Sequence, residues 1–244
     1  MNDRKISKGE LKAAIEAHQS WLETGGEHGE KADLSHCDLS RHNLQRANLE
    51  RANLEGAKLY RVNLRTANLN GANLNGADMV EADLQWTIFL NTDLREACLD
   101  HANLHYANFS SSDLSQASMR NAFLHNGFFS KAILVSVDLR DAIFRFTEVN
   151  DANLKKANLS GASIAVTKMI GADLSDSDLS NTEITMSDFE NANFRNSKFV
   201  NAYLLKNNFK GADLRGTDFN GAKVESTEFS DVRLYRDNRK VQAA

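Results

Sequence analysis

The side chains in this sequence best suited to chemistry are two histidines, His105 and His125, which lie 20 residues apart. Imidazole nitrogens are common ligands of zinc and other transition metals. The sequence repeats with a period that divides 20, so we expect the two side chains about 5 Å apart, close enough to share one ion. No third ligand is evident beside them, and a protein zinc site needs three or four. The sequence therefore predicts no metal site and no cofactor.

Covalent or redox chemistry has equally little support. The two cysteines, Cys37 and Cys98, are expected about 14 Å apart, which is too far for a disulfide. We predict two free thiols, as suits a reducing compartment. No serine, cysteine or threonine stands in a set with a base and an orienting group, so we expect no catalytic residues.

A large apolar residue occupies every fifth position from Leu34 to Leu234. These 41 repeat centres are 24 Leu, 10 Phe and 7 Met, Ile or Val. Two residues before each centre stands a small residue, which is Ala in 23 units. We number each unit 1 to 5, so that Ala32 is position 1, Leu34 position 3 and His36 position 5. A short fixed repeat of this kind replaces ordinary domain reasoning.

A period of five excludes both regular elements. On an α-helix, five residues rotate successive centres by about 140°, so no apolar stripe forms. A long strand would send successive centres to opposite faces. What remains is a short extended piece with positions 1 and 3 pointing inward, followed by a turn at positions 4 and 5. Four units per circuit are indicated by the central Phe residues spaced by multiples of 20, namely Phe89, Phe109, Phe129, Phe189, Phe209 and Phe229.

Runs such as Ala47, Asn48 and Leu49 resemble the pentapeptide repeat family, and the resemblance covers 205 of 244 residues. It implies an all-β solenoid, a right-handed quadrilateral β-helix, with the handedness taken from the family. The repeat predicts about ten 20-residue turns, each of which we call a coil. We expect an N-terminal helical cap at 1–31, the pentapeptide-repeat β-helix at 32–236 and a polar C-terminal tail at 237–244. A filled coil offers no concave site, so we expect no enzyme.

The residues before the repeat predict a capping helix. Ser7 with Glu10 forms a capping box, and Ile6 with Leu11 can form a hydrophobic staple. A cap is favoured over a partner-binding helix, because the end of a solenoid exposes core side chains and strand edges. The side chains expected to cover the first coil are Leu11, Ile15, His18, Trp21 and Leu22.

The outer surface carries the best candidate for function. We name the four faces A to D after their first centres Leu34, Leu39, Leu44 and Leu49. Position 2 is usually Asp or Asn, but apolar residues replace it near the corner between faces C and D. Aromatic and arginine side chains on an exposed apolar surface are typical of a protein-binding hot spot. The predicted partner-binding residues are Trp86, Ile88, Tyr106, Phe123, Phe128, Ile133, Ile143, Arg145 and Phe146.

Three alternatives stay open for this surface. The chain could form a homodimer through this corner or through its C-terminal end. The family resemblance also implies a DNA mimic that binds a type II topoisomerase, as in quinolone-resistance members, but duplex DNA of this length carries about 28 charges. The net charge of this chain is −4. Direct nucleic-acid binding by the Arg, His and aromatic residues is less favoured, because a pI near 6.0 lacks a basic footprint.

Composition indicates a soluble module. Hydrophobic residues make up 41% of the chain, and the sequence contains neither an apolar run near 18 residues nor an N-terminal signal segment. We expect a cytoplasmic protein that does not insert into membranes and that binds an unknown protein partner.

Overall fold

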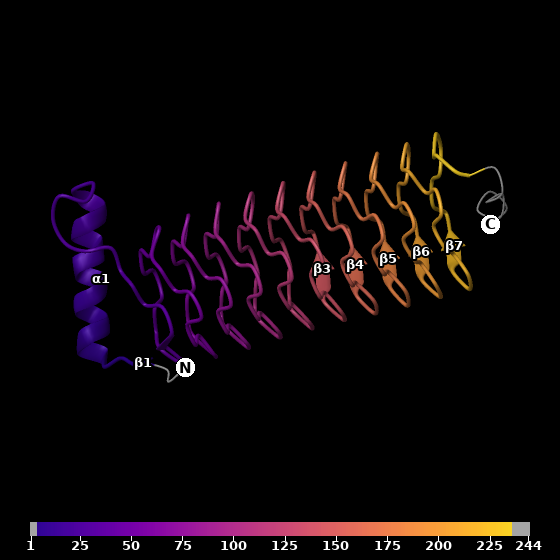
Figure 1. Ribbon diagram of the computed structural model, residues 1–244. Coiled ribbons are helices and arrows are strands. Elements are labelled where there is room, and N and C mark those ends of the chain that lie inside the picture. The colour runs from indigo at the N-terminus through magenta and orange to yellow at the C-terminus, as the bar shows by residue number, and fades with distance from the viewer. Residues whose placement is uncertain (1–3, 236–244) are drawn as a thin grey trace.

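The computed structural model describes residues 4–235 as a rod built from stacked coils, with one helix across its N-terminal end (Figure 1). The elements are β1 (Arg4–Lys5), α1 (Lys8–Glu23), β2 (Cys37–Asp38), β3 (Ile143–Arg145), β4 (Ser163–Ala165), β5 (Glu183–Thr185), β6 (Tyr203–Leu205) and β7 (Lys223–Glu225). Strands β3 to β7 form one parallel sheet on face C. The predicted β-solenoid with an N-terminal capping helix is confirmed.

Each face is a ladder in which position 2 of one coil pairs in parallel with position 2 of the next. On face A, Asp33 pairs with Asn53, and the series continues in steps of 20 residues to Arg233. The amide of Asn53 donates to the Ala32 carbonyl, and its own carbonyl accepts from the Leu34 amide. The ladder bonds of a unit therefore join it to the coils immediately before and after its own.

The corners explain how five residues can form one side. Every position 5 from His36 to Asp231 has positive φ, between 49° and 77°. Together with bonds such as the Ala52 amide to the Leu49 carbonyl at 3.0 Å, this defines a type II β-turn at positions 4 and 5. The turn predicted at these positions is confirmed.

Positions 1 and 3 point inward and fill the coil, as predicted. The central Leu residues from Leu34 to Leu214 are almost fully buried. Phenylalanines stack along the axis, with ring centroids 4.5 Å apart for Phe89 and Phe109 and 4.9 Å apart for Phe109 and Phe129. Small residues at position 1 leave the room that these side chains need inside the coil.

One stretch of the core uses polar side chains, and the sequence pattern alone did not reveal it. From β3 onward, the strands of face C extend to position 4. After β4, β5 and β6, the position 1 amide of face D donates to a side chain of the next coil and not to the preceding position 3 carbonyl. The Thr167 amide donates to Ser187 Oγ, the Ser187 amide to Asn207 Oδ1, and the Asn207 amide to Thr227 Oγ1. The Asn207 side chain also donates to the Ile184 carbonyl. The inward Asn207 side chain thus bonds to backbone on two sides.

The cap is built from a helix and a short strand. Ser7 and Glu10 form the reciprocal capping box, with the Glu10 amide 3.2 Å from Ser7 Oγ and the Ser7 amide 2.8 Å from Glu10 Oε2. Leu11 and His18 are buried, and Ile15 packs partly buried against the core. Strand β1, which pairs with β2 on face B, was not predicted. Ile6 follows it and is buried in the core cluster.

Trp21 and Leu22 lie further along α1 and are half-buried. Trp21 stacks on His18, with ring centroids 5.7 Å apart. Within residues 4–235, no helix is long and apolar enough to span a bilayer. The predicted polar tail at 237–244 lies outside the described residues.

Candidate functional site

A row of exposed apolar side chains follows the corner between faces C and D. Trp86 is 51% exposed, Phe146 54% and Met186 55%, which is unusual for side chains of this kind. We call this surface the CD ridge; its exposed members are Trp86, Ile88, Tyr106, Phe123, Phe128, Phe146, Val166 and Met186.

Backbone geometry holds the ridge side chains outward. Trp86, Tyr106, Phe146, Val166 and Met186 all occupy position 5 of face C, with φ between 50° and 60°. This left-handed region costs an ordinary L-residue roughly 1 to 2 kcal/mol. It is least suited to a β-branched side chain such as that of Val166. The corner therefore displays large side chains at positions where glycine or asparagine would be easier to place.

Basic groups line the position 4 column next to the ridge. His105 and His125 stack with ring centroids 4.5 Å apart, and His105 Nδ1 bonds to the Asn103 side chain. Burial lowers the pKa of His125, and the neighbouring His105 and Arg145 charges lower it further. Arg145 itself is exposed. The ridge thus combines an apolar strip with an exposed cation.

The structure brings most of the predicted partner-binding residues together. Phe123 pairs with Ile143 on face C, where Ile143 is half-buried, and Ile88 and Phe128 share face D. Ile133 is the exception: it pairs with Asp113 in the ladder of face A. A further corner separates it from Phe128, and we exclude it from the ridge. Sequence reasoning did not place Val166 and Met186 among the site residues, although they share the position 5 column with Trp86.

Faces A and B carry most of the position 2 aspartates, and arginines neutralise several of them. Arg95 pairs with Asp93 at 2.6 Å, Arg140 with Asp138 at 2.7 Å and Arg215 with Asp213 at 2.5 Å. The hydrogen bond from Arg95 lowers the pKa of Asp93. These faces therefore carry a weaker negative potential than their Asp content alone would indicate.

Asp100 is the most buried carboxylate on these faces. It accepts from Ser118 Oγ at 2.5 Å and from the Arg120 amide at 3.0 Å, and it also pairs with the Arg120 guanidinium. Burial would raise the pKa of Asp100, but the bonds from Arg120 and Ser118 outweigh it and hold the pKa below the usual range. This cluster of bonds links two successive coils, and we call it the Asp100 staple.

Metal ligation has little support in the part of the chain that the structure describes. Across residues 4–235, no three His, Cys, Asp or Glu side chains are grouped so that they could hold an ion. The stacked His105 and His125 rings lack a third ligand there, and Cys37 and Cys98 are free thiols.

The geometry defines a class of protein: a parallel β-solenoid whose unit is five residues and whose circuit is four units. The family model for pentapeptide repeats matches eight copies over overlapping stretches between residues 30 and 225. The chain belongs to the pentapeptide repeat family. Comparison with curated proteins gave no match.

Solved structures of the family resemble this one. Full-length QnrB1, a plasmid-mediated fluoroquinolone resistance protein, is 19% identical, with 77% of this chain and 92% of QnrB1 covered and a TM-score of 0.53. HetL, a protein involved in heterocyst differentiation regulation from the cyanobacterium Nostoc sp. strain PCC 7120, is 24% identical, with 93% and 96% covered and a TM-score of 0.43. At 19% identity, the likeness to QnrB1 shows the fold alone.

Proposed function

We propose that this protein is a non-catalytic scaffold that holds a protein partner on the CD ridge. The observation that carries the proposal is the column of large side chains at positive φ, from Trp86 to Met186. Position 5 needs only a residue that tolerates this conformation, and eight of the units with positive φ use glycine. A local choice that costs stability is expected where a surface serves another purpose.

The composition of the ridge indicates the chemistry of the partner. Exposed Trp, Tyr and Phe side chains bury large areas on association, and Arg145 beside them can pair with a carboxylate. Trp86 and Tyr106 are already stacked on one another, so little side-chain entropy is lost when they are covered. The fitting partner surface is apolar with acidic groups at its rim.

The test compares a change on the CD ridge with a change elsewhere on the surface. The variant Trp86→Ala/Phe146→Ala removes two anchors of the ridge, whereas Ile133→Ala removes a side chain of similar exposure, 42%, on face A. Each protein is immobilised, captured proteins are quantified, and thermal unfolding is recorded. We expect the double variant alone to lose a partner while all variants stay folded. Retention of every partner by the double variant would rule the ridge out.

Self-association is a second possible use of exposed apolar surface. The ridge can bind a second copy laterally, and the half-buried core residues of the last coil, such as Phe229 and Leu234, favour an end-to-end contact. Light scattering at micromolar concentration separates these cases: a dimer that Trp86→Ala/Phe146→Ala dissociates assigns the ridge to the homodimer. A monomeric mass would exclude self-association at this concentration and favour a different protein as the partner of the ridge.

Binding to a type II topoisomerase is the alternative function, because QnrB1 shares the fold. The ion pairs on faces A and B weigh against close mimicry of DNA charge. A gyrase supercoiling assay with and without quinolone tests it directly. Protection that survives Trp86→Ala/Phe146→Ala and is lost on charge reversal of the acidic faces would replace the ridge proposal.

A further inference from the structure

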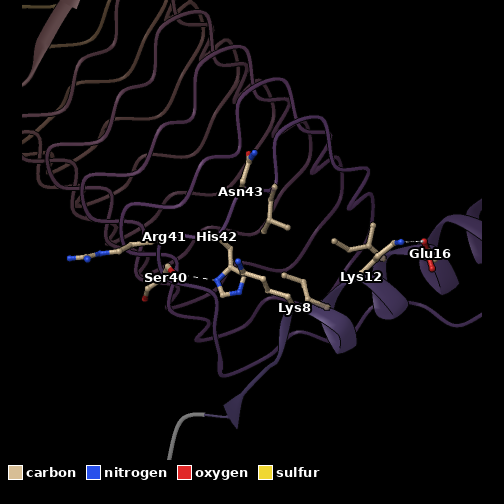
Figure 2. A pocket seen from close by; sticks show the side chains of 10 residues that line it. Lys8, Lys12, Glu16, Ser40, Arg41, His42 and Asn43 are labelled. Atoms are coloured by element: carbon tan, nitrogen blue, oxygen red, sulfur yellow. Dashed lines mark hydrogen bonds and ion pairs between the residues drawn. The ribbon is translucent and has the colours of Figure 1, made fainter.

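A groove lies between the capping helix and the first coil, at the N-terminal edge of face C (Figure 2). Its volume is about 830 Å³, and one wall is the face of α1 that carries Leu11 and Ile15. The opposite wall is the segment from Ser40 to Leu44. In Figure 2 the His42 side chain extends from this segment toward Lys8, and its ring nitrogen Nδ1 donates to the Ser40 carbonyl at 3.2 Å.

The groove exists because the N-terminal segment adds one strand before the first coil on face B but none on face C. Strand β1 supplies the layer before the first coil on face B, with Arg4 aligned to Cys37 and Lys5 to Asp38. Ile6 then points into the core, and from Lys8 the chain continues as α1 instead of forming the next side. Face C therefore begins at Asn43 with a free edge.

The hydrogen bonds of later coils define what is missing at Asn43. On face C, the position 2 amide donates to the position 1 carbonyl of the preceding coil: Asn63 to His42 at 3.0 Å and Asp83 to Val62 at 2.9 Å. The Asn63 carbonyl accepts from the Leu44 amide at 2.7 Å. For the amide and carbonyl of Asn43, residues 4–235 supply no backbone partner. The site is exposed and presents one donor and one acceptor with the geometry of a strand edge.

The lining of the groove selects the kind of strand that fits. By the same register, an added strand would place the side chain after its paired position toward Leu11, Ile15 and Leu44, so that residue must be large and apolar. Charges favour an acidic segment, because the cations Lys8 and Lys12 line the helix wall of the groove. The Arg41 side chain points away from the helix in Figure 2, and its guanidinium lies 5.9 Å from the centroid of the Tyr60 ring. The one carboxylate, Glu16, already pairs with Lys12 at 3.6 Å.

We propose that this groove binds an extended acidic segment of a partner protein, which adds as a parallel strand to Asn43 and supplies the missing side of face C. Its backbone carbonyl accepts from the Asn43 amide, and two residues later its amide donates to the Asn43 carbonyl. Such strand addition draws affinity from main-chain bonds and specificity from the pocket for the apolar side chain. The site is independent of the CD ridge.

The probe is a fluorescent, end-blocked heptapeptide with the residue order Glu-Glu-Ala-Asp-Leu-Glu-Glu, titrated into the full-length protein by anisotropy. Asn43→Pro removes the amide that donates, whereas Asn43→Ala is its matched control. Both lose the side-chain bonds to the Gln45 amide and Asn63 Nδ2. We expect saturable binding that Asn43→Pro weakens about tenfold relative to Asn43→Ala, as the loss of one hydrogen bond predicts. Lys8→Glu/Lys12→Glu should weaken it at least as much.

A second probe leaves the protein unchanged. Methylation of the leucine amide in the peptide removes the donor to the Asn43 carbonyl, and we expect about tenfold weaker binding to the native chain. Hydrogen exchange at the Asn43 amide should slow when the unmethylated peptide is added. The proposal is overturned if the methylated peptide binds equally well, if a peptide with lysine in place of each glutamate competes equally, or if no peptide binds. A mass showing that a second copy fills the groove also overturns it.

Discussion

Trp86 and Tyr106 stack in successive coils with their ring centroids 3.9 Å apart and their planes 6° apart. Both residues have positive φ, so the same backbone conformation that costs stability also aligns the rings. An exposed aromatic pair held this way is a rigid contact surface. The fold does not need large aromatic side chains at these positions, so their presence is explained better by the ridge.

The ridge conformation should be measurable as a stability cost. Val166→Asn places a residue that tolerates positive φ at a corner where φ is 51°. We expect the free energy of unfolding to rise by about 1 kcal/mol. Val135→Asn, at position 4 with negative φ, should not stabilise. Chemical denaturation of the two variants decides the matter, and an equal response at both positions would show that the backbone conformation is unimportant.

The polar column inside the last coils predicts a large effect from one amide. Asn207→Ala leaves the Ser187 amide and the Ile184 carbonyl without the partners they have now. Each buried unsatisfied group costs about 1 to 3 kcal/mol, so the variant should unfold at a clearly lower denaturant concentration. Asn208→Ala removes a surface bond to Asp188 and serves as the control. Comparable midpoints for the two variants would contradict this account of the core.

Acid should weaken the staple at Asp100. Its pKa is lower in the folded chain than in the unfolded one, so its contribution is complete above the unfolded value of about 3.9. That contribution is lost as the pH falls through the folded pKa. Asp100→Asn should lower the free energy of unfolding at pH 7 by about 1 to 3 kcal/mol and flatten its acid dependence. Asp93→Asn, whose carboxylate is more exposed, should have a smaller effect in the same urea titrations at several pH values.

The cap should respond to mildly acidic pH. Burial lowers the pKa of His18, and its Nδ1 accepts from the Ala32 amide at 3.1 Å. The neutral ring therefore stabilises the cap above its unfolded pKa of about 6.5, and this stabilisation is lost as the pH falls through the folded pKa. The nearby charges are those of Lys31, which lowers the pKa, and Glu50, which raises it. Unfolding of the native chain and of His18→Leu between pH 8 and 5 should show a difference that shrinks with acid, and a constant difference would refute the titration.

Most of the fold could be predicted from sequence, because the repeat constrains every unit in the same way. The inward positions, the turn at positions 4 and 5, the four-unit circuit and the box formed by Ser7 and Glu10 all depend on local spacing. Strand β1 could not be predicted, because two residues carry no periodicity. The series of bonds through Ser187, Asn207 and Thr227 was not predicted, because it depends on how successive coils stack.

The candidate site was predicted only in part. Replacement of Asp or Asn at position 2 identified Phe123 and Phe128, and the position 5 column identified Trp86. Ile133 was grouped with them because face A follows face D around the coil, yet the corner after Phe128 separates it from the ridge. The groove at Asn43 had no signal in the sequence, since it results from where the chain leaves the solenoid.

Because residues 20 apart pair on the same face, the number of residues between two positions determines both their distance along the rod and their angle about its axis. Deleting one complete coil would shorten the rod by a single layer and leave every outward side chain facing its original direction. Deleting one pentapeptide between the cap and Trp86 would instead turn the whole distal part by a quarter circuit about the axis. The angle about the axis between the groove and the ridge is therefore set by the number of pentapeptides between them. The relative orientation of two partners bound at these places would depend on that number.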